Sequence, residues 1–160
     1  MMKNTILLTG ISGYIGLHCA KELLDAGYNV RGSIRNQVKG QEVLDTLTAA
    51  SVDTTNLTLI ELDLTSNRGW DEAAAGCEFV MHVASPFVLA NPKEPKDLIS
   101  PAIDGTLRAL RAAKKAGVKR LVLTSSILSM MGSMKTGTFN PSDWTDVDAP
   151  DISTYTKSKT

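Results

Sequence analysis

The chain of 160 residues has no excess of charge of either sign, since 17 Lys+Arg balance 17 Asp+Glu. A chain without a basic field does not attract nucleic acid or an anionic membrane surface, so neither is expected as a partner. It also lacks an apolar run near the roughly 20 residues that cross a bilayer. Thr9, Gly10 and Ser12 interrupt the apolar N-terminal stretch. These absences predict a soluble, cytoplasmic protein.

Cysteine is scarce as well, with only Cys19 and Cys77, both in apolar patterns. Because there is no CxxC pair or Cys/His cluster, the sequence predicts two buried free thiols and no metal site. The hydrophobic content of 42% is enough for the core of one ordinary globular domain, residues 1–160.

Glycine is concentrated in one informative stretch, Thr9–Gly16, which follows the apolar run 6–8 and opens an amphipathic segment that ends at Gly27. Gly10, Gly13 and Gly16 give the spacing G-x-x-G-x-x-G, a departure from the commoner G-x-G-x-x-G. Such a strand–turn–helix unit brings a phosphate close to the backbone and to a helix N-terminus. A glycine-rich turn without a ligand is the alternative.

Beyond this turn, strand and helix patterns alternate. Further strands are expected at 28–35, 57–62, 78–85 and 121–123, and helices at 41–50, 70–75 and 98–117. Five strands joined by helical crossovers predict an α/β fold, a Rossmann-type doubly wound parallel sheet. Pro101 is expected either to kink the last helix or to start it with Ser100 as its cap. Residues 129–153 are expected to form a long loop, either functional or a surface excursion.

The end of the second strand indicates which dinucleotide would bind. A carboxylate there accepts hydrogen bonds from the adenosine ribose of NAD, whereas an arginine suits the 2′-phosphate of NADP. No Asp or Glu follows until Glu42, and the strand is expected to run into a basic loop that contains Arg35 and Lys39. The sequence therefore favours NADP(H), with Arg35 as the main contact and Lys39 as an assistant. The alternative is that both are solvated surface cations.

Two other polar residues allow a structural interpretation. Asp63, just after the third strand, is interpreted as the N-cap of the next helix or, with Leu64, as part of the border of the adenine site, and the two interpretations are compatible. His82 has no acid or nucleophile paired with it in sequence, so we expect a histidine at the edge of the core.

Near the C-terminal end, Tyr155 and Lys159 are four residues apart. In a helix they lie on one face, where the ammonium of a lysine stabilises the phenolate of a tyrosine and makes it useful in proton transfer. Ser126, at the end of the fifth strand, has a hydroxyl that can hold a substrate oxygen. Y-x-x-x-K is common by chance, and a polar helix face is the alternative.

Together these stretches resemble the extended short-chain dehydrogenase/reductases, in the branch of dihydroflavonol reductases, cinnamoyl-CoA reductases and microbial ketone and aldehyde reductases. The stretches that carry the resemblance are Thr9–Gly16, Val30–Arg35, 63–65, 76–86, 119–126 and Tyr155–Lys159.

The resemblance implies NADPH-dependent reduction of a small-molecule carbonyl to an alcohol. Tyr155 would protonate the forming alkoxide, Lys159 would stabilise the phenolate and bind the nicotinamide ribose, and Ser126 would orient the carbonyl. The resemblance also adds residues to the cofactor site named above. The full set of expected cofactor-binding residues is Gly10, Ser12, Gly13, Tyr14, Ile15, Gly16, Arg35, Lys39, Asp63, Leu64, Val83, Ala84, Ser85 and Thr124.

Two departures from the family pattern stand out. Many relatives carry Asn on the long helix where this chain has Ala102, so a proton relay through that helix is not expected. Relatives also continue for about as many residues again, including a C-terminal substrate domain that this sequence lacks. A truncated gene product, a deliberate fragment and a partial sequence of a longer molecule are the three explanations. Members are monomers or homodimers.

Two other functions remain open. One is a sugar-nucleotide epimerase or dehydratase that retains NAD, which the basic end of the second strand disfavours. The other is a non-catalytic, truncated nucleotide-binding module.

Overall fold

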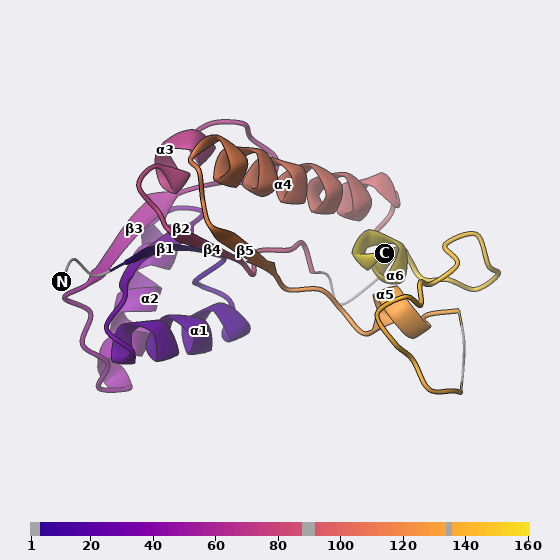
Figure 1. The fold of residues 1–160 in the computed structure, drawn as a ribbon, viewed down its shortest axis with the longest axis horizontal. Coiled ribbons are helices and arrows are strands. Elements are labelled where there is room, and N and C mark those ends of the chain that lie inside the picture. Colours follow the sequence, from indigo (N-terminus) through magenta and orange to yellow (C-terminus); the bar gives the residue numbers. More distant parts are fainter. Residues whose placement is uncertain (1–3, 88–91, 134–135) are drawn as a thin grey trace. The chain divides into compact units, whose positions relative to one another are not determined.

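A parallel five-stranded sheet organises the chain, whose computed structural model describes residues 4–87, 92–133 and 136–160. The strand order is β3-β2-β1-β4-β5, and every neighbouring pair is parallel (Figure 1). This confirms the predicted doubly wound sheet. The strands are β1 (Thr5–Thr9), β2 (Asn29–Ile34), β3 (Leu57–Glu61), β4 (Phe79–His82) and β5 (Arg120–Leu123).

The helices follow the strands in the alternation that the sequence predicts. They are α1 (Tyr14–Asp25), α2 (Gln37–Ala49), α3 (Trp70–Ala74), α4 (Lys96–Lys115), α5 (Leu128–Met131) and α6 (Thr154–Lys159). The chain forms two compact units, residues 1–84 with 105–124, and residues 85–104 with 125–160. The first unit contains the sheet, and the second contains α5 and α6.

Neighbouring residues of β1 face opposite sides of the sheet, as the pleat of a strand requires. Leu7 belongs to a core cluster with Trp70 of α3 and Ala109 of α4. Leu8 belongs to another, with Ala20 of α1 and Val43 of α2. Apolar side chains on both faces of one strand are typical of a buried parallel sheet, and they place a helical layer on each face.

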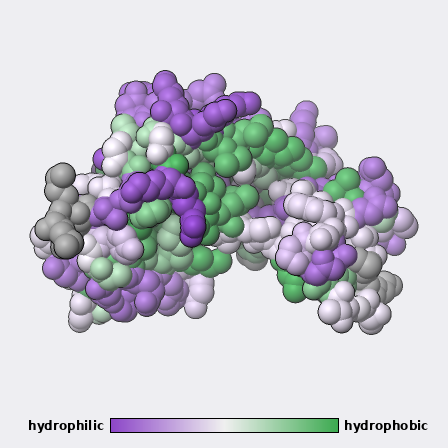
Figure 2. All heavy atoms as spheres, in the orientation of Figure 1, coloured by the Kyte–Doolittle hydropathy of each residue, from purple (hydrophilic) through white to green (hydrophobic). Residues whose placement is uncertain are grey.

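At the β5 edge of the sheet, apolar side chains reach the surface. Figure 2 shows hydrophobic residues over α4 and β5. Leu107 and Leu110 of α4 are 38% and 44% exposed, and Val122 and Leu123 of β5 are 49% and 45% exposed. Among the described residues no helix is both long and apolar enough to cross a bilayer.

The structure corrects two sequence-based expectations about helix starts. Helix α2 begins at Gln37 rather than at residue 41, because the Asn36 side chain accepts a hydrogen bond from the Lys39 N–H at 3.0 Å and caps the helix. Helix α4 begins at Lys96 rather than at residue 98. Of the two positions expected for Pro101, the one inside the helix is correct, and the start after a Ser100 cap is wrong.

The expected loop at 129–153 and the expected thiols are each partly corrected. The loop's first residues belong to the short helix α5, where the Thr145 hydroxyl donates to the Leu128 carbonyl at 2.5 Å and accepts from the Gly132 N–H at 2.8 Å. Both cysteines are free thiols, but only Cys77 is buried, while Cys19 is half-buried on α1.

We predict that Leu8→Ala lowers the free energy of unfolding by about 3 kcal/mol, because it leaves a cavity beneath α1 and α2. Leu8 is 0% exposed. Urea unfolding followed by circular dichroism measures the change. Val38→Ala, at a side chain that is 69% exposed, is the control and is expected to shift stability by less than about 0.5 kcal/mol. Equal effects of the two substitutions would contradict this assignment of the core.

Candidate functional site

The glycine turn between β1 and α1 is closed so tightly that two of its glycines leave no room for a side chain. Gly10 has φ of 71°, and a Cβ there would lie 2.8 Å from the backbone of Ala84. A Cβ on Gly16 would lie 2.1 Å from the Gly10 carbonyl oxygen. The Gly13 N–H donates to that same oxygen at 3.0 Å. Gly10 and Gly16 thus serve the close packing of the helix on the strand, whereas a Cβ on Gly13 would lie 3.4 Å from the Gly10 oxygen, an ordinary contact.

Helix α1 then presents its N-terminus beside the turn. Gly13 is its N-cap and provides no side-chain cap, and its first turn holds no acidic residue. The N–H groups of Tyr14, Ile15 and Gly16 have no acceptor within the helix by its geometry, and they carry the positive end of its dipole. The side chains of Tyr14 and Ile15 are 80% and 51% exposed, and Ser12 is half-buried. This arrangement is a backbone cradle for an anion.

Three buried polar side chains, those of Thr9, Ser33 and His82, hold the glycine turn and the end of β4 by hydrogen bonds. Thr9 Oγ1 accepts from the Ala84 N–H at 3.1 Å and is hydrogen-bonded to His82 Nδ1 at 2.8 Å. On the other side of the turn, Ser33 Oγ accepts from the Gly10 N–H at 3.0 Å. His82 is 1% exposed. The structure thus places His82 in the sheet beneath the turn, slightly deeper than the core-edge position that the sequence suggested. Sequence reasoning missed Ser33 and the Thr9 side chain, although a polar residue inside an apolar strand is a usable signal.

The basic residues after β2 have different surroundings. Arg35 is exposed at the carboxyl end of the strand. Lys39 lies in the first turn of α2 rather than in a loop, and its ammonium pairs with the Glu42 carboxylate at 2.5 Å. Arg35 is therefore the cation placed at the strand end, while Lys39 already has a carboxylate partner.

Asp63 lies at the corresponding end of β3. Its Oδ1 accepts from the Thr65 N–H at 2.7 Å and from the Thr65 hydroxyl at 2.6 Å. These bonds, followed by the nearby positive charges of Arg35 and Arg108, lower the pKa of Asp63. The N-cap interpretation is wrong, because Gly69 caps α3 and Asp63 closes a local turn instead. Leu64 follows, half-buried.

Strands β4 and β5 contribute the remaining expected residues of the first unit. Val83 packs against the cluster that contains Leu8, and Ala84 lies against Gly10. The Thr124 N–H donates to the His82 carbonyl at 3.0 Å, which continues the β4–β5 pairing by one residue. The carboxyl ends of β1, β2, β3, β4 and β5 thus carry the glycine turn, Arg35, Asp63, Val83 with Ala84, and Thr124.

The second unit holds the expected proton-transfer residues. Helix α6 starts after the Ser153 side chain, which accepts from the Thr156 N–H at 3.1 Å. Lys159 Nζ lies 5.5 Å from the centroid of the Tyr155 ring, so the predicted pairing on one helix face is present. Lys159 Nζ also donates to Ser85 Oγ at 2.5 Å, and the Phe87 ring meets the Tyr155 ring edge-on at 5.8 Å.

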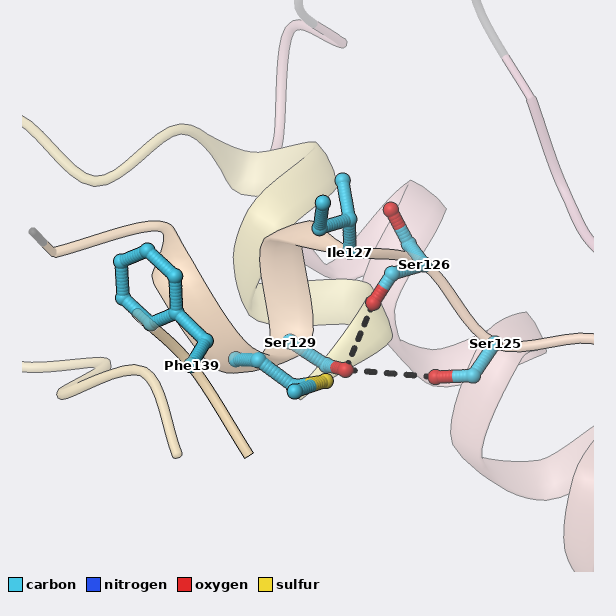
Figure 3. A pocket seen from close by; sticks show the side chains of 6 residues that line it. Ser125, Ser126, Ile127, Ser129 and Phe139 are labelled. Atoms are coloured by element: carbon cyan, nitrogen blue, oxygen red, sulfur yellow. Dashed lines mark hydrogen bonds between the residues drawn. The ribbon is translucent and has the colours of Figure 1, made fainter. Parts of the chain in front are cut away.

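Ser126 lines a pocket of about 550 Å³ in the same unit (Figure 3). The Leu128 N–H donates to Ser126 Oγ at 3.2 Å, and Ser129 Oγ donates to the Ser126 carbonyl at 2.7 Å. Sequence reasoning did not identify the apolar members of this pocket. Its lining residues are Ser125, Ser126, Ile127, Ser129, Met130 and Phe139. Among the described residues no His, Cys, Asp and Glu side chains form a group that could hold a metal ion.

The profile of the NAD dependent epimerase/dehydratase family matches residues 6–160. The chain belongs to this family. The dihydroflavonol 4-reductase of Callistephus chinensis is 36% identical over 146 residues, which are 90% of this chain and 40% of that protein. The bifunctional dihydroflavonol 4-reductase/flavanone 4-reductase of Malus domestica is 36% identical over 150 residues, 91% of this chain and 42% of that protein.

Solved structures agree. Yeast methylglyoxal/isovaleraldehyde reductase Gre2, complexed with NADPH, has a TM-score of 0.80 and 26% identity over 97% of this chain and 49% of that chain. Vestitone reductase from alfalfa has a TM-score of 0.79 and 28% identity over 99% and 49%. The resemblance drawn from the sequence is confirmed. The chain spans about two fifths of these curated relatives and about half of these solved structures.

Burial lowers the pKa of Lys159 from 10.5. In an NMR titration of dimethylated lysines, we expect the signal that Lys159→Arg removes to titrate below 10.5 when the chain is folded and near 10.5 in concentrated urea. Between the lowered value and 10.5 the unfolded chain binds more protons, so stability rises with pH across that window. A folded-state pKa at or above 10.5 would contradict the buried position of this ammonium.

Proposed function

We propose that the chain is the NADP(H)-binding part of a reductase that converts a ketone or an aldehyde to an alcohol. The observation that carries this proposal is the Tyr155–Lys159 pair on one face of α6, where a phenol and an ammonium lie close together. The family and the reductases among its relatives support the same reaction class.

The cofactor fits the residues present in the first unit. Gly10 and Gly16 leave no room for a side chain, and the exposed N-terminus of α1 would hold the pyrophosphate on the N–H groups of Ser12, Tyr14, Ile15 and Gly16. Arg35 would bind the 2′-phosphate with a forked guanidinium, with Lys39 assisting. Asp63 and Leu64 would border the adenine. Val83, Ala84 and Thr124 would pass beside the remainder of the cofactor, and the resemblance assigns the same role to Ser85 of the second unit.

Three side chains of the second unit would perform the proton chemistry. Bound NADPH supplies a hydride to the carbonyl carbon of the substrate. Ser126 Oγ would donate a hydrogen bond to the carbonyl oxygen and orient it. Tyr155 Oη would give its proton to the alkoxide oxygen that forms, and the Lys159 ammonium would stabilise the phenolate that remains. Lys159 would also bind the nicotinamide ribose, in place of its present partner Ser85.

The pocket beside Ser126 indicates how such a substrate would lie. Its serine hydroxyls suit the carbonyl oxygen, while Ile127, Met130 and Phe139 offer an apolar surface to the rest of the molecule. A small-molecule carbonyl compound with an apolar body fits this lining.

The family description also covers NAD-dependent epimerases and dehydratases, which are the second candidate. Arg35, exposed where an adenosine 2′-phosphate would lie, argues for the reductase. NAD that remains tightly bound through purification would favour the epimerase instead.

We predict that Arg35→Ala weakens NADPH binding at least about tenfold while leaving NADH affinity unchanged, because only NADPH carries the 2′-phosphate. Fluorescence titration of the 160-residue chain with each dinucleotide measures both affinities. Arg120→Ala is the matched control, since Arg120 is an exposed arginine at the opposite, amino end of a strand. Equal NADPH and NADH affinities in the wild type would rule out the NADP(H) assignment.

We also predict that Tyr155→Phe reduces carbonyl turnover at least about a hundredfold without weakening NADPH binding, because it removes the acid and keeps the ring. Loss of NADPH absorbance with an aldehyde or ketone measures turnover. Tyr28→Phe controls for loss of a phenol elsewhere. Undiminished turnover in Tyr155→Phe would remove Tyr155 from the mechanism, and NADPH binding without any turnover in the wild type would support the non-catalytic module.

A further inference from the structure

The segment between β3 and α3, residues 63–68, is held in one conformation from several sides. We call it the β3–α3 turn. It begins where the Leu62 N–H donates to the Ile34 carbonyl at 2.9 Å, so it starts directly beside the end of β2. Within it, the Ser66 N–H donates to the Asp63 carbonyl at 3.2 Å. The two Thr65 bonds to the Asp63 carboxylate close it further. Its backbone therefore makes local bonds near the place where the adenine would lie.

Arg108, on the part of α4 that belongs to the same unit, binds this turn at two points. Its Nη1 donates to the Leu64 carbonyl at 2.5 Å, and its Nε donates to the Asn67 side-chain oxygen at 2.5 Å. The two atoms belong to one planar, rigid guanidinium, so both acceptors are fixed in one geometry relative to α4. A lysine could not make both bonds from fixed positions in a plane.

Two further contacts press on the same turn. Gly105, one turn before Arg108 on α4, lies so close to Leu64 that a Cβ there would be 2.5 Å from Leu64 Cδ2. On the α3 side, Trp70 Nε1 donates to the Ser66 carbonyl at 2.9 Å, and Trp70 is 4% exposed. Leu64 is thus held by α4 at its backbone oxygen and at its side chain.

We propose that Arg108 is a positioning residue for the adenosine end of the cofactor, acting through Leu64 and Asn67 rather than through contact with the cofactor. The proposal rests on the NADP(H) binding proposed above. Because NADPH and NADH share the adenine, a residue that shapes the turn affects both dinucleotides equally. A residue that contributes its charge affects NADPH more, through the 2′-phosphate.

The difference between the effects on NADPH and on NADH distinguishes a cation that positions the turn from a cation that attracts the 2′-phosphate. Asp63 lies near both Arg35 and Arg108, whose positive charges help to lower the pKa of its carboxyl. An electrostatic contribution of Arg108 to cofactor binding is therefore the alternative to its positioning role. Only the pattern of affinities distinguishes these effects, since either predicts weaker binding when the arginine is removed.

The experiment compares Arg108→Met, Arg108→Lys and Asn67→Ala in the 160-residue chain. NADPH, NADH, adenosine 2′,5′-bisphosphate and nicotinamide mononucleotide serve as probes in binding titrations. Arg111→Met is the matched control, because it removes the same charge from an exposed position three residues further along α4. The unfolding midpoint of each variant is measured in parallel.

We expect Arg108→Met to weaken NADPH, NADH and the bisphosphate by the same factor, on the order of tenfold, and to leave nicotinamide mononucleotide unchanged. Arg108→Lys keeps the charge but should bind these three probes as weakly as Arg108→Met does. Asn67→Ala, at an exposed side chain, should weaken the same three probes equally but by a smaller factor. Arg111→Met should change none of these affinities.

Other results overturn the proposal. A loss confined to the 2′-phosphorylated probes and restored by Arg108→Lys would make Arg108 an electrostatic contact. A lower unfolding midpoint with unchanged affinities would make it purely structural. If Arg108→Met does not fold, Asn67→Ala decides, and unchanged affinities in it reject the positioning role. A wild-type chain that binds neither dinucleotide would overturn the proposed function, and with it this inference.

Discussion

The hydroxyl of Thr9 is the contact on which the site of the first unit depends. It accepts from the Ala84 N–H and is hydrogen-bonded to His82, so it joins the ends of β1 and β4, the strands between which the chain reverses its direction across the sheet. Ligands of doubly wound sheets bind at this switch point. The backbone of Ala84 leaves no room for a Cβ at Gly10.

Hydrogen bonds between neighbouring strands position the other strand ends of this site. Ser33 of β2 holds the Gly10 N–H, and the Leu62 N–H links the end of β3 to β2. Each strand end thus depends on a neighbouring strand. In the second unit the expected catalytic side chains are positioned by a short helix instead of by a sheet. This helix carries Tyr155 and Lys159, and the lysine donates a hydrogen bond to Ser85.

Local patterns predicted the elements and the glycine turn because the causes are local: apolar alternation, glycine spacing and a helical i,i+4 pair. The same local reasoning placed Lys39 in a loop, since it did not weigh the Asn36 cap. Arg108, Ser33 and the Thr9 side chain could not be assigned in this way. Their partners lie 44, 23 and 75 residues away in sequence, so their roles exist only once the sheet has formed.

The positions of Arg35 and Asp63 have a consequence for any substitution that introduces an acid at position 35. Exchanging Arg35 for the carboxylate that suits an NAD ribose would set a second negative charge near Asp63, whose own charge is now favoured by Arg35 and by the Thr65 bonds. Like charges so placed repel. Because the Leu62–Ile34 bond ties the two strand ends together, neither carboxylate can retreat with its backbone. An acid at position 35 would therefore raise the pKa of the Asp63 carboxyl, through the loss of the Arg35 cation and the gain of a like charge.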